Sequence, residues 1–154
     1  MYRSLSLATY VKKRNGVALG AAHSMRNMLF RSLGAGSFAT FWHYWNPIWG
    51  FYLAKFVMRP LSYHLPSWLA LILTFTVSGA LHDIAVSLVK WQSVFMFTPW
   101  FFLMGAWVVL SGYFSISYAG VGWVFRAMLN ILQIASCFII VRYLLDFGGT
   151  MPNV

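Results

Sequence analysis

Two polar clusters stand inside an apolar stretch that runs from residue 38 to residue 83. The first is FWHYWNP at residues 41–47, and the second is SGALHD at residues 78–83. The second cluster lies toward the end of a run that is long and apolar enough to cross a membrane as a helix. An ionisable side chain at that depth is costly and usually has a function. We therefore expect Asn46 and His82 to meet in one buried site, with the rest of the chain as its membrane scaffold.

The composition is that of an integral membrane protein. Of the 154 residues, 60% are hydrophobic and only 8% are charged, whereas soluble domains carry about 25% charged residues. A soluble fold of this length could not bury so much apolar surface. The net charge is +9, and six of the eleven basic residues precede residue 32, beside apolar segments. This pattern favours lipid headgroups as the partner and argues against nucleic acid.

Hydropathy and proline positions divide the chain into segments. Residues 1–37 lack acids and predict a basic amphipathic segment on the membrane surface, with a helix from residue 17 to residue 33. Residues 38–60 predict a broken, re-entrant or interfacial segment, because Pro47 disfavours helical geometry at Asn46. We therefore predict an all-α, polytopic membrane protein with the amino terminus in the cytoplasm. The remaining predicted spans lie at 68–89, 94–115 and 122–145. Together with the broken segment they form a membrane domain at 38–145, which is followed by a tail at 146–154.

The orientation follows from the basic residues. If residues 38–58 do not cross the membrane, nine Lys or Arg residues lie on the amino-terminal side and two on the other. If that segment crosses, the split becomes eight to three. Basic residues gather on the cytoplasmic side, so the first arrangement is slightly favoured.

His82 is the main candidate for chemistry. On a helix, Ser78 and Gly79 share its face, so Ser78 could bond the imidazole and Gly79 could leave room for a substrate. A neutral imidazole can take a proton from an alcohol. The alternative is a buried histidine bonded to a carbonyl of a neighbouring helix. Asp83 points about 100° away from His82 around the helix, and we expect it to pair with a Lys or Arg.

Asn46 is the second candidate. Its amide can polarise a carbonyl or hold an oxyanion, although an Asn before a proline is also a common turn residue. His43 and Trp45 could line the same pocket, and the alternative for the tryptophans is an aromatic belt at the membrane interface. The four histidines have no metal-site spacing and the chain has only two acids, so we expect neither a metal nor a bound cofactor.

Taken together, FWHYWNP at 41–47, Arg59-Pro60-Leu61 and TFTVSGALHD at 74–83 resemble the membrane-bound O-acyltransferase family, in particular its wax-synthase-like and bacterial branches. That family carries an F-W-x-x-W-N/H element, a basic-Pro-Leu element and an S-G-x-x-H element, in this order. The likeness covers about residues 25–90 and extends to the later segments only in hydropathy. Family members are usually much longer, so the chain resembles their carboxy-terminal catalytic portion.

The resemblance implies transfer of an acyl group from a thioester, usually acyl-CoA as co-substrate, to a hydroxyl acceptor in lipid metabolism. It implies that His82 is the catalytic base and that Asn46 positions the carbonyl or the oxyanion. It also implies a homo- or hetero-oligomer or a missing amino-terminal half. The alternative function is a non-catalytic membrane subunit or lipid-binding scaffold that keeps the motif as packing. A proton-conducting transporter is less favoured, because a single ionisable residue makes a poor relay.

Overall fold

A computed structural model describes residues 6–147 of the chain. These residues form helices joined by short connections and contain no strand, which confirms the predicted all-helical class. In chain order the elements are α1 (Leu7–Asn15), α2 (Ser24–Leu33), α3 (Phe38–Tyr44), α4 (Pro47–Leu53), the π-helical turn η1 (Ala54–Met58), α5 (Arg59–Ser62), α6 (Ser67–Lys90), α7 (Phe97–Tyr113) and α8 (Trp123–Phe147).

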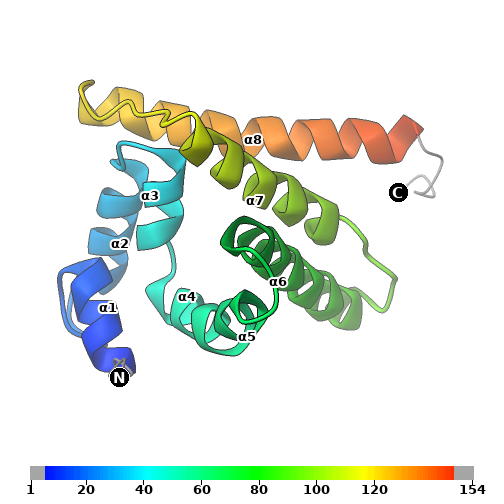
Figure 1. Cartoon of the computed structure of the whole chain (residues 1–154), viewed down its shortest axis with the longest axis horizontal. Coiled ribbons are helices and arrows are strands. Elements are labelled where there is room, and N and C mark those ends of the chain that lie inside the picture. Colours follow the sequence, from blue (N-terminus) through cyan, green and yellow to red (C-terminus); the bar gives the residue numbers. More distant parts are fainter. Residues whose placement is uncertain (1–5, 148–154) are drawn as a thin grey trace.

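Helices α6 and α7 form an antiparallel hairpin at the centre of the molecule (Figure 1). Two glycines let these helices approach closely. A Cβ atom at Gly79 would lie 2.4 Å from the carbonyl oxygen of Phe97, and one at Gly105 would lie 2.9 Å from Cβ of Phe75. The expectation that Gly79 leaves room for a substrate is therefore wrong, because the backbone of α7 fills that space. The buried side chains of the adjoining core are Phe38, Met104, Val108 and Cys137.

Replacement of Gly79 by alanine is expected to lower the free energy of unfolding by about 1–3 kcal/mol, because the methyl group would overpack the contact between α6 and α7. The atoms that it would meet belong mostly to the backbone of Phe97 and cannot rotate away. Gly112 is the matched control, since a Cβ atom there meets nothing within 4 Å. Unfolding of the two variants in detergent, followed by circular dichroism, makes the comparison. Equal stabilities of the Gly79→Ala and Gly112→Ala variants would contradict the close approach of α6 and α7.

The segment at residues 38–60 is broken, as predicted. Helix α3 ends at Tyr44, and Asn46 takes left-handed backbone angles of φ 39° and ψ 69° before α4 begins at Pro47. The predicted end of this segment at residue 60 is wrong, because helical structure continues to Ser62. Pro60 lacks an N–H group and its ring would clash with the carbonyl four residues earlier. The wider π turn of η1 lies directly before it and accommodates the proline.

The amino-terminal part contains two helices in place of the single one predicted from residue 17. Helix α1 ends at Gly16, which takes a left-handed φ of 82°. Buried Asn15 then joins the two helices, since its Nδ2 atom donates to the carbonyl oxygen of Ser24 at 3.0 Å and to its Oγ atom at 2.7 Å. The residues from 17 to 23 form turns, and α2 begins only at Ser24.

A buried polar network ties α8 to the amino-terminal half. Asn130, which is completely buried, donates from Nδ2 to the carbonyl oxygens of Leu33 at 2.9 Å and Ala35 at 3.0 Å. Its Oδ1 atom accepts from the hydroxyl of Tyr118, which also accepts from Gln133. Burial raises the pKa of Tyr118 despite the hydrogen bond from Gln133, so the hydroxyl remains a neutral donor. The connections before α3 and before α8 are therefore held together.

Two helices, α6 and α8, are long and apolar enough to cross a membrane. The predicted spans at 68–89 and 122–145 match them within two residues. The predicted span at 94–115 is too long, because α7 has 17 residues, fewer than the ~20 that a bilayer requires. Residues 146 and 147 belong to α8 and not to the predicted tail, and residues 148–154 lie outside the described part of the chain.

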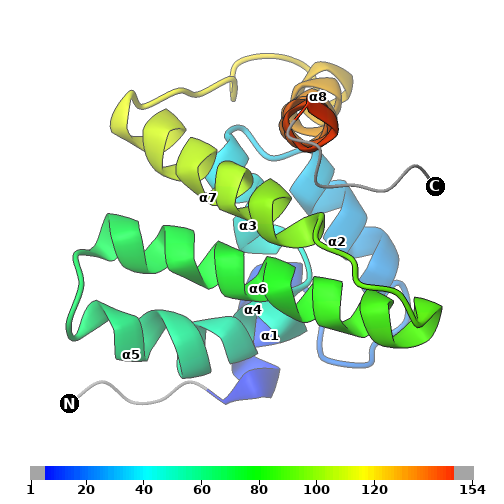
Figure 2. The ribbon, with the colours of Figure 1, turned by 90° about the vertical axis from the view of Figure 1, so that its right-hand side faces the viewer.

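The two long helices cross steeply. Figure 1 shows α8 along its whole length and α6 foreshortened. In Figure 2, after a quarter turn, α8 is seen end-on and α6 along its length. Helix α8 packs on α7, α2 and α3 and leaves much of its apolar surface exposed.

Candidate active site

Trp49, on the first turns of α4, connects the two polar clusters. Its backbone N–H donates to Oδ1 of Asn46 at 3.2 Å, and its indole Nε1 donates to Oγ of Ser78 at 2.9 Å. Its ring also meets the ring of His82 edge-on, with 6.2 Å between the centroids. No hydrogen bond in residues 6–147 joins Asn46 directly to His82, and Asn46 is exposed. The predicted meeting of the two residues in one buried site is therefore not seen, and Trp49 is the residue that contacts both.

His82 is half-buried among aromatic rings of α7. Its ring stacks on Phe101, with 5.1 Å between the centroids, and lies 5.8 Å from the ring of Phe97. The Nδ1 atom lies 2.7 Å from the backbone carbonyl oxygen of Ser78. A carbonyl can only accept a hydrogen bond, so Nδ1 carries a proton, and in the neutral form of the ring the lone pair is then on Nε2. That arrangement is the one that a general base needs.

Ser78 acts through its carbonyl as well as its side chain. The sequence left open whether Ser78 would bond the imidazole, and it is the carbonyl oxygen that does so. The buried hydroxyl accepts from Trp49. The carbonyl that fixes His82 therefore belongs to its own helix, one turn back, and not to a neighbouring helix.

Asp83 has a role that the sequence did not predict. We expected a Lys or Arg partner, but its carboxylate accepts hydrogen bonds from the backbone N–H groups of Met96, Phe97 and Thr98 and from the hydroxyl of Thr98. These groups begin α7, where backbone N–H groups have no partner inside the helix. Asp83 thus caps α7 from a different helix and fixes Phe97 against His82.

Asn46 is exposed and holds the start of α4. Its Oδ1 atom is taken by Trp49, and its backbone N–H donates to the sulfur of Met28 at 3.3 Å. Asparagine tolerates the left-handed backbone better than most residues, and Pro47 disfavours the ordinary helical region before it. Within the described part of the chain, no hydrogen bond uses the Nδ2 group. Its two N–H donors therefore have no hydrogen-bond acceptor among the described residues.

His43 and Trp45 contribute neither a hydrogen bond nor a ring contact to His82 within residues 6–147. Trp45 stacks on Phe41 with 5.5 Å between the centroids. Loss of hydration lowers the pKa of His43, and the positive charges of Arg14 and Lys13 lower it further. Both predicted pocket residues therefore lie apart from the site, and Trp49, which the sequence analysis left out, takes their place.

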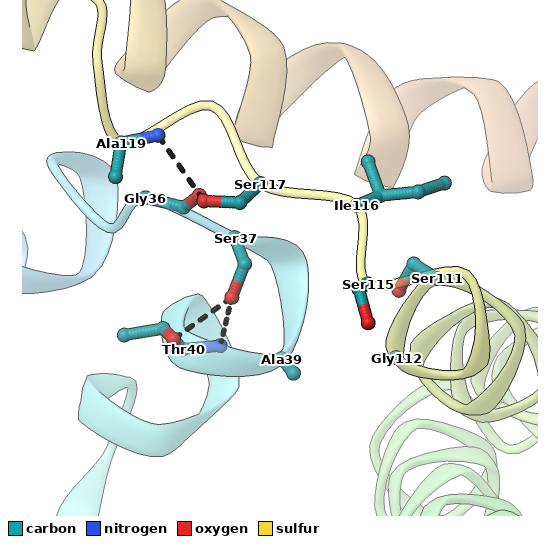
Figure 3. Close-up of a pocket in the computed structure, with 10 residues that line it drawn as sticks. All are labelled: Gly36, Ser37, Ala39, Thr40, Ser111, Gly112, Ser115, Ile116, Ser117 and Ala119. Atoms are coloured by element: carbon teal, nitrogen blue, oxygen red, sulfur yellow. Dashed lines mark hydrogen bonds between the residues drawn. The ribbon is translucent and has the colours of Figure 1, made fainter.

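A separate cavity of about 430 Å³ lies between the start of α3, the end of α7 and the loop after it (Figure 3). Ser37 accepts from the backbone N–H of Thr40 on one wall, and Ser117 donates to the carbonyl oxygen of Gly36 on another. Small and hydroxyl side chains line it, and neither His82 nor Asn46 is among them. The lining residues are Gly36, Ser37, Ala39, Thr40, Ser111, Gly112, Ser115, Ile116, Ser117 and Ala119.

Replacement of Trp49 by phenylalanine keeps a ring near His82 but removes the N–H donor to Ser78. We expect the thermal midpoint to change little, since one such hydrogen bond contributes about 1 kcal/mol. Any acyl transfer should fall about tenfold, because misplacement of a catalytic group is costly. The control is Trp68→Phe, at an exposed tryptophan on the first turn of α6. Equal rates for the two variants would show that Trp49 does not contribute to the site.

Comparison of the chain with family models, with curated proteins and with solved structures found no match. The resemblance to membrane-bound O-acyltransferases therefore stays a prediction that depends on the motifs at residues 41–83.

Proposed function

We propose that the chain is a membrane-embedded O-acyltransferase of the membrane-bound O-acyltransferase type, with His82 as its general base. The observation that carries this proposal is the connected series Asn46–Trp49–Ser78–His82, which joins the two motifs. The donor is an acyl thioester such as acyl-CoA, and the acceptor is a hydroxyl group. The proposed reaction needs no metal, because the histidine base and the amide donors supply its acid–base and electrostatic groups.

The residues suggest a simple order of events. Nε2 of His82 takes the hydroxyl proton while the acceptor oxygen bonds to the thioester carbonyl carbon. The N–H donors of Asn46 hold the oxyanion of the tetrahedral intermediate. The carbonyl then re-forms, the carbon–sulfur bond breaks, and the imidazolium returns its proton to the thiolate. The products are an ester and a free thiol, and His82 is again neutral.

The proposal places the chain in a bilayer with α6 and α8 as spans. Their 24 and 25 residues correspond to about 36–38 Å at about 1.5 Å per residue. The hydrocarbon core is about 30 Å thick, so each helix can tilt by about 35° and still cross. If α6 and α8 tilt in opposite directions, both can span the bilayer even though they cross each other steeply. The amino terminus is cytoplasmic, and α1 and α2 lie at the membrane surface.

One observation favours the alternative function, a non-catalytic subunit or lipid-binding scaffold. The space beside Gly79 is filled by α7, and aromatic rings pack on His82. Such packing is also what a structural histidine would show. If the chain is an acyltransferase, a homo- or hetero-oligomer or a missing amino-terminal half would complete the binding site for its substrates.

The experiment that tests the proposal is thiol release from acyl-CoA by the wild-type chain in nanodiscs. Release is measured with a mixture of long-chain and sterol alcohols and without any acceptor. Release that requires the acceptor, with the matching ester found by mass spectrometry, would support an acyltransferase. Release at the rate of empty nanodiscs in both cases would favour the non-catalytic alternative.

A further inference from the structure

Positive side chains from two helices converge on the end of α3. The guanidinium group of Arg31 lies over the ring of Tyr44, with 4.6 Å from Cζ to the centroid. Arg14 donates to the carbonyl oxygen of His43 at 3.2 Å and interacts electrostatically with Tyr44. Lys13 is exposed, and its positive charge lowers the pKa of His43. We call Lys13, Arg14, Arg31, His43 and Tyr44 the α3-end cluster.

No acidic side chain neutralises this cluster. The chain has two acids, Asp83 and Asp146, and neither precedes residue 83. Asp83 accepts hydrogen bonds from the start of α7, and Asp146 pairs with Arg142 at 3.2 Å. Within residues 6–147, three positive charges from α1 and α2 therefore have no carboxylate partner. Charges held together in this way repel one another, and an anion between them would relieve the repulsion.

We infer that the α3-end cluster binds a phosphate group, with Arg14 and Arg31 as its main ligands. The planar guanidinium group matches the geometry of phosphate oxygens and can donate two parallel hydrogen bonds. Lys13 adds an exposed positive charge at the rim, and Tyr44 adds a hydroxyl group. The phosphate belongs either to the headgroup of an anionic phospholipid or to a soluble phosphorylated molecule. This inference does not depend on the proposed acyl transfer.

Two binding measurements on the full chain in detergent distinguish the sources of the phosphate. In the first, native mass spectrometry counts lipid bound from an equal mixture of phosphatidylglycerol and phosphatidylcholine. In the second, calorimetry follows titration with inorganic pyrophosphate. We expect the wild type to retain phosphatidylglycerol selectively if the source is lipid, or to bind pyrophosphate if the source is soluble. The double variant R14Q/R31Q should weaken whichever binding is seen by about tenfold or more, since charge-assisted hydrogen bonds are lost.

The control K55Q/R59Q removes two exposed positive charges outside the cluster and should bind within about twofold of the wild type, because its lost charges are screened by solvent. Arg14 also bonds to the backbone, so K13Q serves as a variant that leaves this bond in place; a smaller loss is expected from it. The inference is overturned if the wild type binds neither probe, or if R14Q/R31Q and K13Q both bind like the wild type. An equal loss in K55Q/R59Q and R14Q/R31Q would also overturn it, since general charge would then explain the binding.

Discussion

Replacement of Asp83 by alanine is expected to lower the free energy of unfolding by about 3–5 kcal/mol, because it leaves four buried or partly buried donors without a partner. The side chain is 5% exposed and accepts four hydrogen bonds of 2.6–2.9 Å. Three of them come from backbone N–H groups at the start of α7, which neither the helix nor the surrounding apolar side chains can satisfy. The same change should also loosen Phe97 against His82 and reduce any activity.

Two further variants make this prediction specific. Asp83→Asn keeps one acceptor oxygen and should lose part of the stability only. Asp146→Ala removes the other acid, whose exposed pair with Arg142 contributes no more than about 0.5 kcal/mol. Chemical unfolding in mixed micelles compares all three variants with the wild type. If Asp83→Ala were no less stable than Asp146→Ala, the proposed cap on α7 would be wrong.

Much of the fold could be predicted from local sequence. Runs of apolar residues located α6 and α8 within two residues, because hydropathy depends on composition alone. Pro47 located the break after α3, because proline restricts its own backbone and that of Asn46. The cap on α7 could not be predicted in this way, since it comes from Asp83, thirteen or more residues earlier.

The sequence pointed to His82 and Asn46 as candidates, but it did not predict the contacts around them. His82 and Asn46 carry recognisable chemistry, whereas Trp49 looked like one more aromatic residue. Its position three residues after Asn46 was the available signal, because a helix-capping side chain accepts from that backbone N–H. The steep crossing of α6 and α8 depends on tertiary packing, including the link from Asn130 to residues 33 and 35. The hydrophobic periodicity of a single segment cannot predict a contact between distant segments.

Replacement of His82 by alanine is expected to reduce acyl transfer by about 10²–10⁴-fold, the usual contribution of a general base. The carbonyl of Ser78 fixes the proton on Nδ1, so only Nε2 can receive the acceptor's proton. Glutamine at this position keeps polarity and approximate size but has no basic nitrogen, and it should be as inactive as alanine. Unchanged unfolding midpoints in both variants would show that the loss is chemical.

Acceptor-dependent thiol release from acyl-CoA by His82→Ala, measured beside His64→Ala in the same nanodiscs, tests the central claim most directly. His64 is exposed in the connection before α6, and its loss should leave the rate unchanged. We predict wild-type rates for His64→Ala and rates close to those of empty nanodiscs for His82→Ala. Full release by a folded His82→Ala variant would contradict the assignment of His82 as the base.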